Sequence, residues 1–188
     1  LDVLKKNLDV PVFDLIGSVA SNIQESRVGV IATPSTVKTK AYTNAILEFK
    51  PKTFVIEQPC PELVPMIEMN DINLYEIKDV AARYLQPLIK QKIHSLILGC
   101  SHYPLITPLL SEILPSSVQL IDPAEALSLK LKLFIDSKAS NYSKKKNLVD
   151  LKFYVTSKLE NFPNKTKRWL NVFPEVNLVS LQKKGWVS

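Results

Sequence analysis

The sequence is poor in glycine and cysteine, on which several common kinds of site depend. Its four glycines are scattered, so none form the G-x-G-x-x-G or P-loop patterns that cradle nucleotide phosphates. Two cysteines are too few for a disulfide scaffold, which is typical of shorter, secreted chains. We therefore expect Cys60 and Cys100 to be reduced thiols of a cytoplasmic protein, with a Cys60–Cys100 bridge as the alternative.

Long hydrophobic runs and dense patches of charge are also scarce. No apolar run approaches the roughly 20 residues of a membrane-spanning helix, and no secretory signal is visible in a sequence that opens on Leu1, before which an address could lie. The net charge of +6 comes from dispersed lysines, and the one dense run, 144–146, reads as a solvated loop. A polyanion-binding patch is the alternative, but it would normally add interleaved aromatic residues. The composition therefore predicts no membrane and no nucleic acid as a partner.

Short β-branched apolar runs alternate with amphipathic segments along the chain. The runs are near-continuous, as in strands buried on both faces of a parallel sheet. The predicted strands are 11–16, 27–33, 53–58, 94–100, 118–122, 151–156 and 176–181, and the predicted helices are 34–50, 79–92, 103–114 and 123–135. This alternation predicts the α/β class, with open, mostly parallel sheets and flanking helices.

The predicted elements are unevenly distributed between domains. Residues 26–126 contain four strands with their helices and form a complete α/β domain. Residues 1–25 contain the tail of a helix and one strand, and neither this flank nor 127–188 is long enough to bury a core alone. We expect 1–25 to be the remnant of a first α/β domain, which 127–188 returns to complete in part.

Polar and titratable side chains collect where the predicted strands end. Thr33 to Thr36 follow one strand, Glu57 to Cys60 the next, Cys100 to His102 the third and Asp122 the fourth. Ligands of open α/β sheets bind at the carboxyl ends of the strands. This pattern favours a site at that edge, and an ordinary rim of polar loops is the alternative.

The segment LILGCSHYPLI, residues 96–106, leaves two roles open for Cys100. A cysteine in an α/β core is usually a small buried hydrophobe. At the turn from a strand into a helix, however, helix N–H groups stabilise a thiolate, and His102 can donate to it or carry its proton. Zinc needs three or four ligands, and only Cys100 and His102 are near, because His94 is predicted to begin the same strand and to have no catalytic role. We therefore expect no metal.

Four blocks resemble, in order and spacing, the successive motifs of glutamate racemases. They are VGVIATPSTVKTKAY (28–42), CPELVPMIE (60–68), LGCSHYPLI (98–106) and LIDPAEAL (120–127), and a weaker match at FYVTSKLENF extends the similarity to about Leu170. The resemblance implies two α/β domains facing each other across a cleft, and interconversion of L- and D-glutamate for peptidoglycan synthesis. It also implies that no cofactor is needed, and that the partners are the small-molecule substrate and, as in many family members, a second copy in a homodimer.

The resemblance assigns site residues by position. Cys100 matches the catalytic cysteine that is the base for the L-isomer, and His102 matches the histidine that assists it. The positions that match substrate-binding residues are Thr33, Thr36, Ser101 and Glu68. Ser101 stands where the family usually has threonine and keeps the hydroxyl. Glu68 matches a carboxylate that helps to fix the substrate ammonium and the histidine.

The family's mechanism uses two cysteines on opposite faces of the substrate Cα, and only one matches here. The other lies in a Cys-Asn-Thr motif shortly before the helix whose tail is LDVLKKNL, with an Asp-Ser-Gly segment further upstream. Neither is in this sequence, which opens on Leu1, and Cys60 matches a non-catalytic cysteine. We expect an N-terminally truncated racemase with one domain incomplete, inactive alone. The alternatives are a non-catalytic glutamate-binding or interaction module and a racemase of a related amino acid such as aspartate.

Overall fold

The computed structural model describes residues 2–69, 73–138, 152–157 and 162–180, in two compact units, Leu1–Ala139 and Ser140–Ser188. The elements of the first unit are α1 (Asp2–Asn7), α2 (Leu15–Ala20), β1 (Arg27–Ala32), α3 (Pro34–Thr39), α4 (Ala41–Phe49), β2 (Phe54–Pro59), α5 (Leu63–Glu68), α6 (Leu74–Lys90), β3 (Ser95–Leu98), the 3₁₀ helix η1 (Tyr103–Ile106), α7 (Thr107–Ile113), β4 (Gln119–Ile121) and α8 (Pro123–Lys138). The domain boundaries at 26 and 126 stay a prediction.

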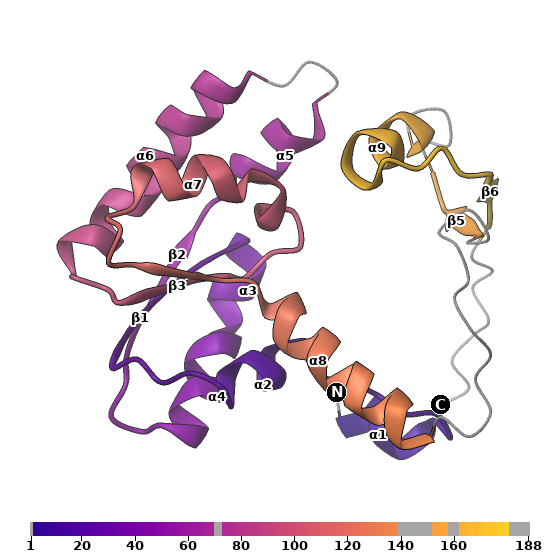
Figure 1. The fold of residues 1–188 in the computed structure, drawn as a ribbon, viewed down its shortest axis with the longest axis horizontal. Helices are drawn as coiled ribbons and strands as arrows, with labels where there is room; N and C mark the ends of the chain where they lie inside the picture. The colour runs from indigo at the N-terminus through magenta and orange to yellow at the C-terminus, as the bar shows by residue number, and fades with distance from the viewer. Residues whose placement is uncertain (1, 70–72, 139–151, 158–161, 181–188) are drawn as a thin grey trace. The chain divides into compact units, whose positions relative to one another are not determined.

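The first unit is built on a four-stranded parallel sheet with the order β2-β1-β3-β4 (Figure 1). Five of the six residues of β1 are buried, as expected for a central strand that is covered on both faces. The chain runs from β1 outward to β2 and then crosses back to β3, which pairs with the other side of β1. The α/β class and the four strands predicted between 27 and 122 are confirmed.

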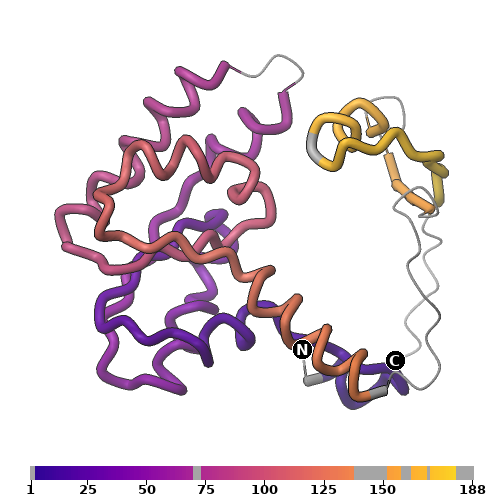
Figure 2. Tube along the Cα trace, in the orientation of Figure 1, coloured from indigo at the N-terminus to yellow at the C-terminus, as the bar shows by residue number. Residues whose placement is uncertain are grey.

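Helices cover both faces of this sheet. Figure 1 shows α5, α6 and α7 on one side and α2, α3 and α4 on the other, and Figure 2 follows the same strand–helix alternation along the trace. On the α6 side, the buried helix residues at helical spacing are Ile77, Val80, Ala81, Leu85 and Leu88. On the α4 side, the core cluster contains Val19, Ala20, Ile23, Val28, Val30, Ala32, Tyr42, Ile46 and Ile97. Each large apolar side chain buried in this way stabilises the fold by roughly 1.5–3 kcal/mol before entropy is counted.

Two predictions in the N-terminal part of the chain, the strand at 11–16 and the single helix at 34–50, are wrong for local reasons. Residues 11–16 do not form a strand, because Asp14 accepts a hydrogen bond from the Ile16 N–H (3.1 Å) and caps α2 instead. The helix predicted over 34–50 is two helices, α3 and α4, because Lys40 between them has a left-handed φ of 51°.

Proline divides the helix predicted over 103–114 into η1 and α7. Pro108 has no N–H, so a continuous α-helix would leave the carbonyl of Pro104 without its usual donor. The N–H of Thr107 donates to this carbonyl instead and closes a 3₁₀ turn. In α6, by contrast, Pro87 lies in the last turn and does not divide the helix, which begins at Leu74 and not at the predicted residue 79.

The second unit contains β5 (Phe153–Val155), α9 (Phe162–Leu170) and β6 (Val176–Leu178). β5 and β6 pair in parallel, which confirms the two predicted strands. Residues 144–146, 151 and 181, which carry parts of the predictions, lie outside the described residues. Within the described part of the chain, no helix is long and apolar enough to cross a membrane.

The residue Lys92, just after the end of α6, has a strained backbone conformation that affects stability. Lys92, which follows the helix, has a φ of 51°, a conformation that costs a residue with a side chain about 1 kcal/mol. We expect Lys92→Gly to raise the free energy of unfolding in urea by about 0.5–1 kcal/mol. Lys90→Gly, at the last residue of the helix, is the matched control and should lower the free energy of unfolding, because Lys90 has ordinary helical geometry. Equal losses in both variants would contradict this account of Lys92.

Candidate active site

The predicted site residues lie at the carboxyl edge of the sheet, where β1 and β3 end side by side. Thr33 follows β1, and Cys100 follows β3 after Gly99. The N–H of Gly99 donates to the carbonyl of Ile31 (2.8 Å), so the strand ends stay paired up to the turn. The connections from β1 and β3 go to opposite faces of the sheet (Figure 1). This is the topological switch point, where open α/β sheets bind their ligands.

Three titratable side chains form a chain of contacts at this edge. Cys100 Sγ lies 3.9 Å from Nδ1 of His102, and His102 Nε2 lies 2.7 Å from Oε1 of Glu68. The side chains of His102 and Glu68 are 30% and 38% exposed, so a ligand can reach them. When Nε2 donates its hydrogen to the carboxylate, Nδ1 keeps its lone pair and faces the thiol. The imidazole can then take the thiol proton and leave a thiolate.

Glu68 reaches the site from α5, a helix that the sequence analysis did not predict. It is the last residue of α5, and Leu63 and Ile67 of the same helix are buried against the rest of the unit. The helix therefore holds the carboxylate beside His102, although the two residues are 34 positions apart. The helical spacing of Leu63 and Ile67 was the signal available in the sequence.

The helix expected to begin beside Cys100 does not reach it. The α-helix α7 begins only at Thr107, and the turn after Cys100 leads into the single 3₁₀ turn η1. The thiol therefore adjoins a 3₁₀ turn and not the first turn of an α-helix, and stabilisation of a thiolate by this turn stays a prediction. His102 is the polar group that contacts the thiol.

The two cysteines are free and differ in environment. Cys60 is 1% exposed, and burial raises the pKa of its thiol to about 12, with a smaller contribution from Cys100. Cys60 follows β2 and Cys100 follows β3, with β1 between them. Two strand spacings are about 10 Å, longer than the roughly 7 Å that a disulfide spans between Cα atoms. The geometry therefore opposes a Cys60–Cys100 bridge.

The threonine pair occupies the turn into α3. Thr33 caps this helix by accepting from the N–H of Thr36 (3.4 Å), and the two hydroxyl oxygens are 3.0 Å apart. Both residues are half-buried. Ser101 is exposed in the turn directly after Cys100. The hydroxyls and the thiol thus reach the same edge from adjacent strands.

Tyr103 is a supporting residue that the sequence analysis did not single out. It is fully buried, and its hydroxyl donates to the carbonyl of Cys60 (3.2 Å). Burial raises the pKa of this hydroxyl, so it keeps its proton. Tyr103 thereby joins the turn after β2 to the turn that carries Cys100 and His102.

The other histidine lies away from this edge. His94 is exposed directly before β3, where its N–H donates to the carbonyl of Arg27 at the start of β1 (2.8 Å). Its position at the beginning of the strand agrees with the prediction. Among the described residues, no three His, Cys, Asp or Glu side chains gather as a metal ion would require.

Comparison with known proteins places the chain among racemases. A model of the Asp/Glu/Hydantoin racemase family matches residues 1–129. The glutamate racemase of Prochlorococcus marinus strain NATL2A is 84% identical over 188 residues, which are 100% of this chain and 71% of that protein. The glutamate racemase of Synechococcus sp. strain CC9605 is 40% identical over 179 residues, which are 94% of this chain and 68% of that protein.

Solved structures agree with the sequence relatives. A glutamate racemase isoform of Bacillus anthracis is similar with a TM-score of 0.83 at 27% identity, over 96% of this chain and 68% of that one. The glutamate racemase of Francisella tularensis, solved in complex with D-glutamate, has a TM-score of 0.80 at 33% identity, over 95% of this chain and 67% of that one. The family model covers more than half of the sequence, and the chain therefore belongs to the Asp/Glu/Hydantoin racemase family of amino-acid isomerases.

Proposed function

We propose that this chain carries one catalytic face of a glutamate racemase, which interconverts L- and D-glutamate and supplies D-glutamate for peptidoglycan. The observation that carries the proposal is the contact chain Cys100–His102–Glu68 at the switch point of the sheet. The glutamate racemases of Prochlorococcus marinus and Francisella tularensis, to which the chain is similar, support glutamate as the substrate.

In the proposed reaction, the Cys100 thiolate removes the α-proton of L-glutamate. The C–H electron pair stays on Cα as a carbanion, and the proton becomes the Cys100 thiol proton. An acid on the opposite face of Cα then delivers a proton and produces D-glutamate; the reverse reaction uses the same steps backwards. His102, held at Nε2 by Glu68, accepts the thiol proton at Nδ1 and releases it to water, which restores the thiolate, while the acid on the opposite face takes up a proton from water.

Hydroxyl groups at the same edge are suited to a substrate carboxylate. We assign this role to Thr33, Thr36 and Ser101, whose hydroxyls can donate without adding charge beside the thiolate. We also assign to Glu68 the binding of the substrate ammonium, in addition to its contact with His102, because 38% of its side chain is exposed. Fixed donors of this kind stabilise the charge that develops when Cα loses its proton.

The opposite face needs a second acid that this chain does not supply. The sequence has only two cysteines, and Cys60 is buried with a pKa raised to about 12. We therefore assign the second thiol to the Cys-Asn-Thr motif that the resemblance places upstream. The free thiols support a cytoplasmic location, where cysteines stay reduced, and the resemblance supports a homodimer.

The test follows the α-proton of glutamate in deuterated water by NMR while chiral chromatography measures inversion. We expect a protein extended upstream to include the Cys-Asn-Thr segment to exchange and invert glutamate. The 188-residue chain is expected to exchange L-glutamate at most, without inverting it. Aspartate is the parallel substrate, and preference for it would replace glutamate in the proposal.

Two outcomes would contradict the proposal. If the extended protein neither exchanges nor inverts glutamate or aspartate, it is not a racemase of these amino acids. If the 188-residue chain inverts glutamate at the rate of the extended protein, the second thiol is not required.

A further inference from the structure

Tyr42 is a buried aromatic residue that reaches the turn carrying Cys100. It lies in the first turn of α4 and is 1% exposed. A Cβ added to Gly99 would lie 2.9 Å from Tyr42 Cε2, 2.8 Å from the carbonyl oxygen of Ile31 and 3.1 Å from the Cβ of Ala32. The edge of the ring therefore lies directly against the backbone of Gly99, the residue before the catalytic thiol.

Hydrogen bonds to strand β2 hold the first turn of α4, which carries Tyr42, against the sheet. Lys40 precedes this helix and provides no side-chain cap. Glu57 of β2 caps the helix instead: its Oε1 accepts hydrogen bonds from the N–H of Thr43 (2.8 Å) and from the Thr43 hydroxyl (2.6 Å). Charge-assisted bonds of this kind are stronger than neutral ones. Tyr42 is thus held by β2 through its own helix and packs against the turn after β3.

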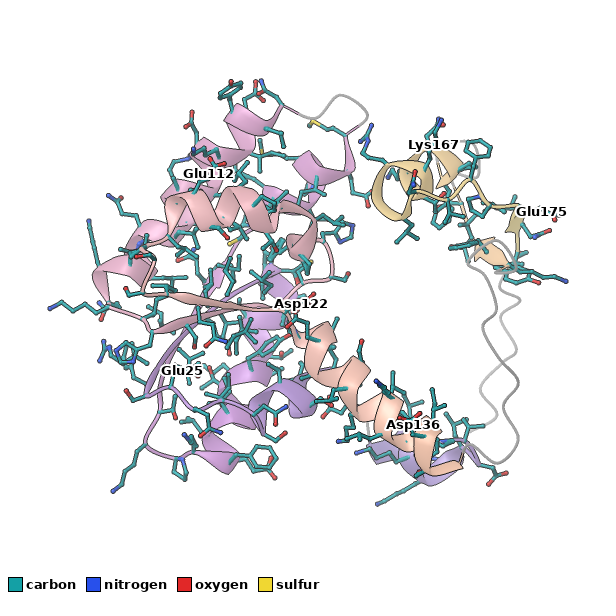
Figure 3. The ribbon with its side chains drawn as sticks, in the orientation of Figure 1. Glu25, Glu112, Asp122, Asp136, Lys167 and Glu175 are labelled. Atoms are coloured by element: carbon teal, nitrogen blue, oxygen red, sulfur yellow. The ribbon has the colours of Figure 1, made fainter. Side chains whose placement is uncertain are left out.

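The hydroxyl of Tyr42 is held in its neutral form by its environment. Burial raises its pKa to about 12, and negative charge on Cys100, Glu57, Asp122 and Asp14 contributes to the increase. Asp122 lies where β4 leads into α8 (Figure 3) and caps that helix through the N–H of Ala124 (2.9 Å). The phenol consequently stays neutral and adds no further negative charge near the thiolate.

We propose that Tyr42 is a positioning residue for the proton transfer: its ring supports the Gly99–Cys100 turn and so holds Cys100 Sγ at the place from which it reaches the substrate Cα. This inference rests on the proposed function of Cys100 as the reacting thiol. Proton abstraction depends steeply on position, since a displacement of about 1 Å can cost about 100-fold in rate.

The variant Tyr42→Leu, made in the extended protein, tests whether the Tyr42 ring supports the Gly99–Cys100 turn. It should lower kcat by about 10- to 100-fold while KM changes less than about threefold, because the substrate-binding hydroxyls remain. The rate at which iodoacetamide alkylates Cys100, measured by mass spectrometry of the peptide, should change at least about threefold. Tyr42→Phe keeps the ring and should restore kcat and the alkylation rate to about the parental values.

Ile46→Ala is the matched control. Ile46 lies one turn further along α4, is fully buried and belongs to the same cluster as Tyr42, but it is not among the three nearest contacts of a Cβ placed on Gly99. Its replacement should lower the melting temperature and leave kcat and the alkylation of Cys100 unchanged below that temperature.

The proposal is overturned if Tyr42→Leu keeps the parental kcat and alkylation rate, or if Tyr42→Phe is as impaired as Tyr42→Leu. It is also overturned if Ile46→Ala changes the alkylation of Cys100 as much as Tyr42→Leu does. Alkylation of Cys100 needs no turnover, so it tests the positioning role of Tyr42 independently of the proposed racemase function. A parent protein that does not exchange glutamate overturns the proposed function, while an alkylation rate that depends on the ring at position 42 still supports the positioning role.

Discussion

Replacement of Cys100 by alanine is expected to lower the exchange of the L-glutamate α-proton by about 10²–10⁴-fold, the usual contribution of a positioned general base. No other described side chain with the chemistry of a thiolate reaches the site, because Cys60 is 1% exposed. The rate of inversion should fall by as much, since Cys100 transfers a proton both when L-glutamate becomes D-glutamate and in the reverse reaction. The rates are measured by NMR in deuterated water and by chiral chromatography, with the extended protein as the parent.

Cys60→Ala removes the other thiol of this chain and is the matched control. It should leave exchange and inversion at parental rates and cost about 1 kcal/mol of stability, because Cys60 packs in the core. Iodoacetamide should label Cys100 well before Cys60, whose pKa is raised to about 12. Parental exchange in Cys100→Ala, or loss of exchange in Cys60→Ala, would contradict the assignment of the thiols.

Glu68→Gln is expected to reduce kcat/KM for glutamate by about 10- to 100-fold. The amide removes the negative charge that holds the Nε2 hydrogen of His102, so Nδ1 no longer reliably presents a lone pair to Cys100. The two enantiomers of glutamate have equal free energy in water, so kcat/KM must fall equally in both directions. The step at Cys100 should become more limiting, which raises the isotope effect on α-deuterated L-glutamate more than on the D-isomer.

Glu112→Gln makes the same chemical change away from the site. Glu112 of α7 (Figure 3) forms an exposed ion pair with Lys78 of α6 (2.6 Å). Such pairs contribute about 0–1 kcal/mol, so the control should keep parental kinetics and nearly parental stability. A Glu68→Gln protein with the parental rate and the parental isotope effects would show that the carboxylate does not act through His102.

Local sequence patterns predicted much of the sheet. The continuous apolar runs at 27–33 and 94–100 are β1 and β3, because only strands covered on both faces combine β-branched residues without polar alternation. The start of α3 was equally readable, since Thr33 and Pro34 are a cap and a first helical residue. The apolar run at 11–16 was wrongly predicted to be a strand, because Asp14 within it caps α2 and so begins a helix at Leu15.

The site residues were less accessible to reasoning from the residues alone. Local chemistry left Cys100 between a core thiol and an acid–base thiol, and the racemase resemblance, not periodicity, selected the second. Glu68 was named only through that resemblance, because an acidic residue at the end of an unpredicted helix carries no local signal. Tyr42 and Tyr103 look like ordinary core aromatics in the sequence, and only their contacts with Gly99 and Cys60 give them a place at the site.

The sequence by itself determined the α/β class, most strands and the family, since these depend on residue patterns that act over a few neighbouring positions. The tertiary structure decided the strand order β2-β1-β3-β4, which brings Thr33 and Cys100 to adjacent strand ends. It also decided the pairing of Glu68 with His102 across 34 positions. Contacts of this kind depend on which faces pack together, and that choice minimises exposed apolar surface over the whole unit rather than in any single segment.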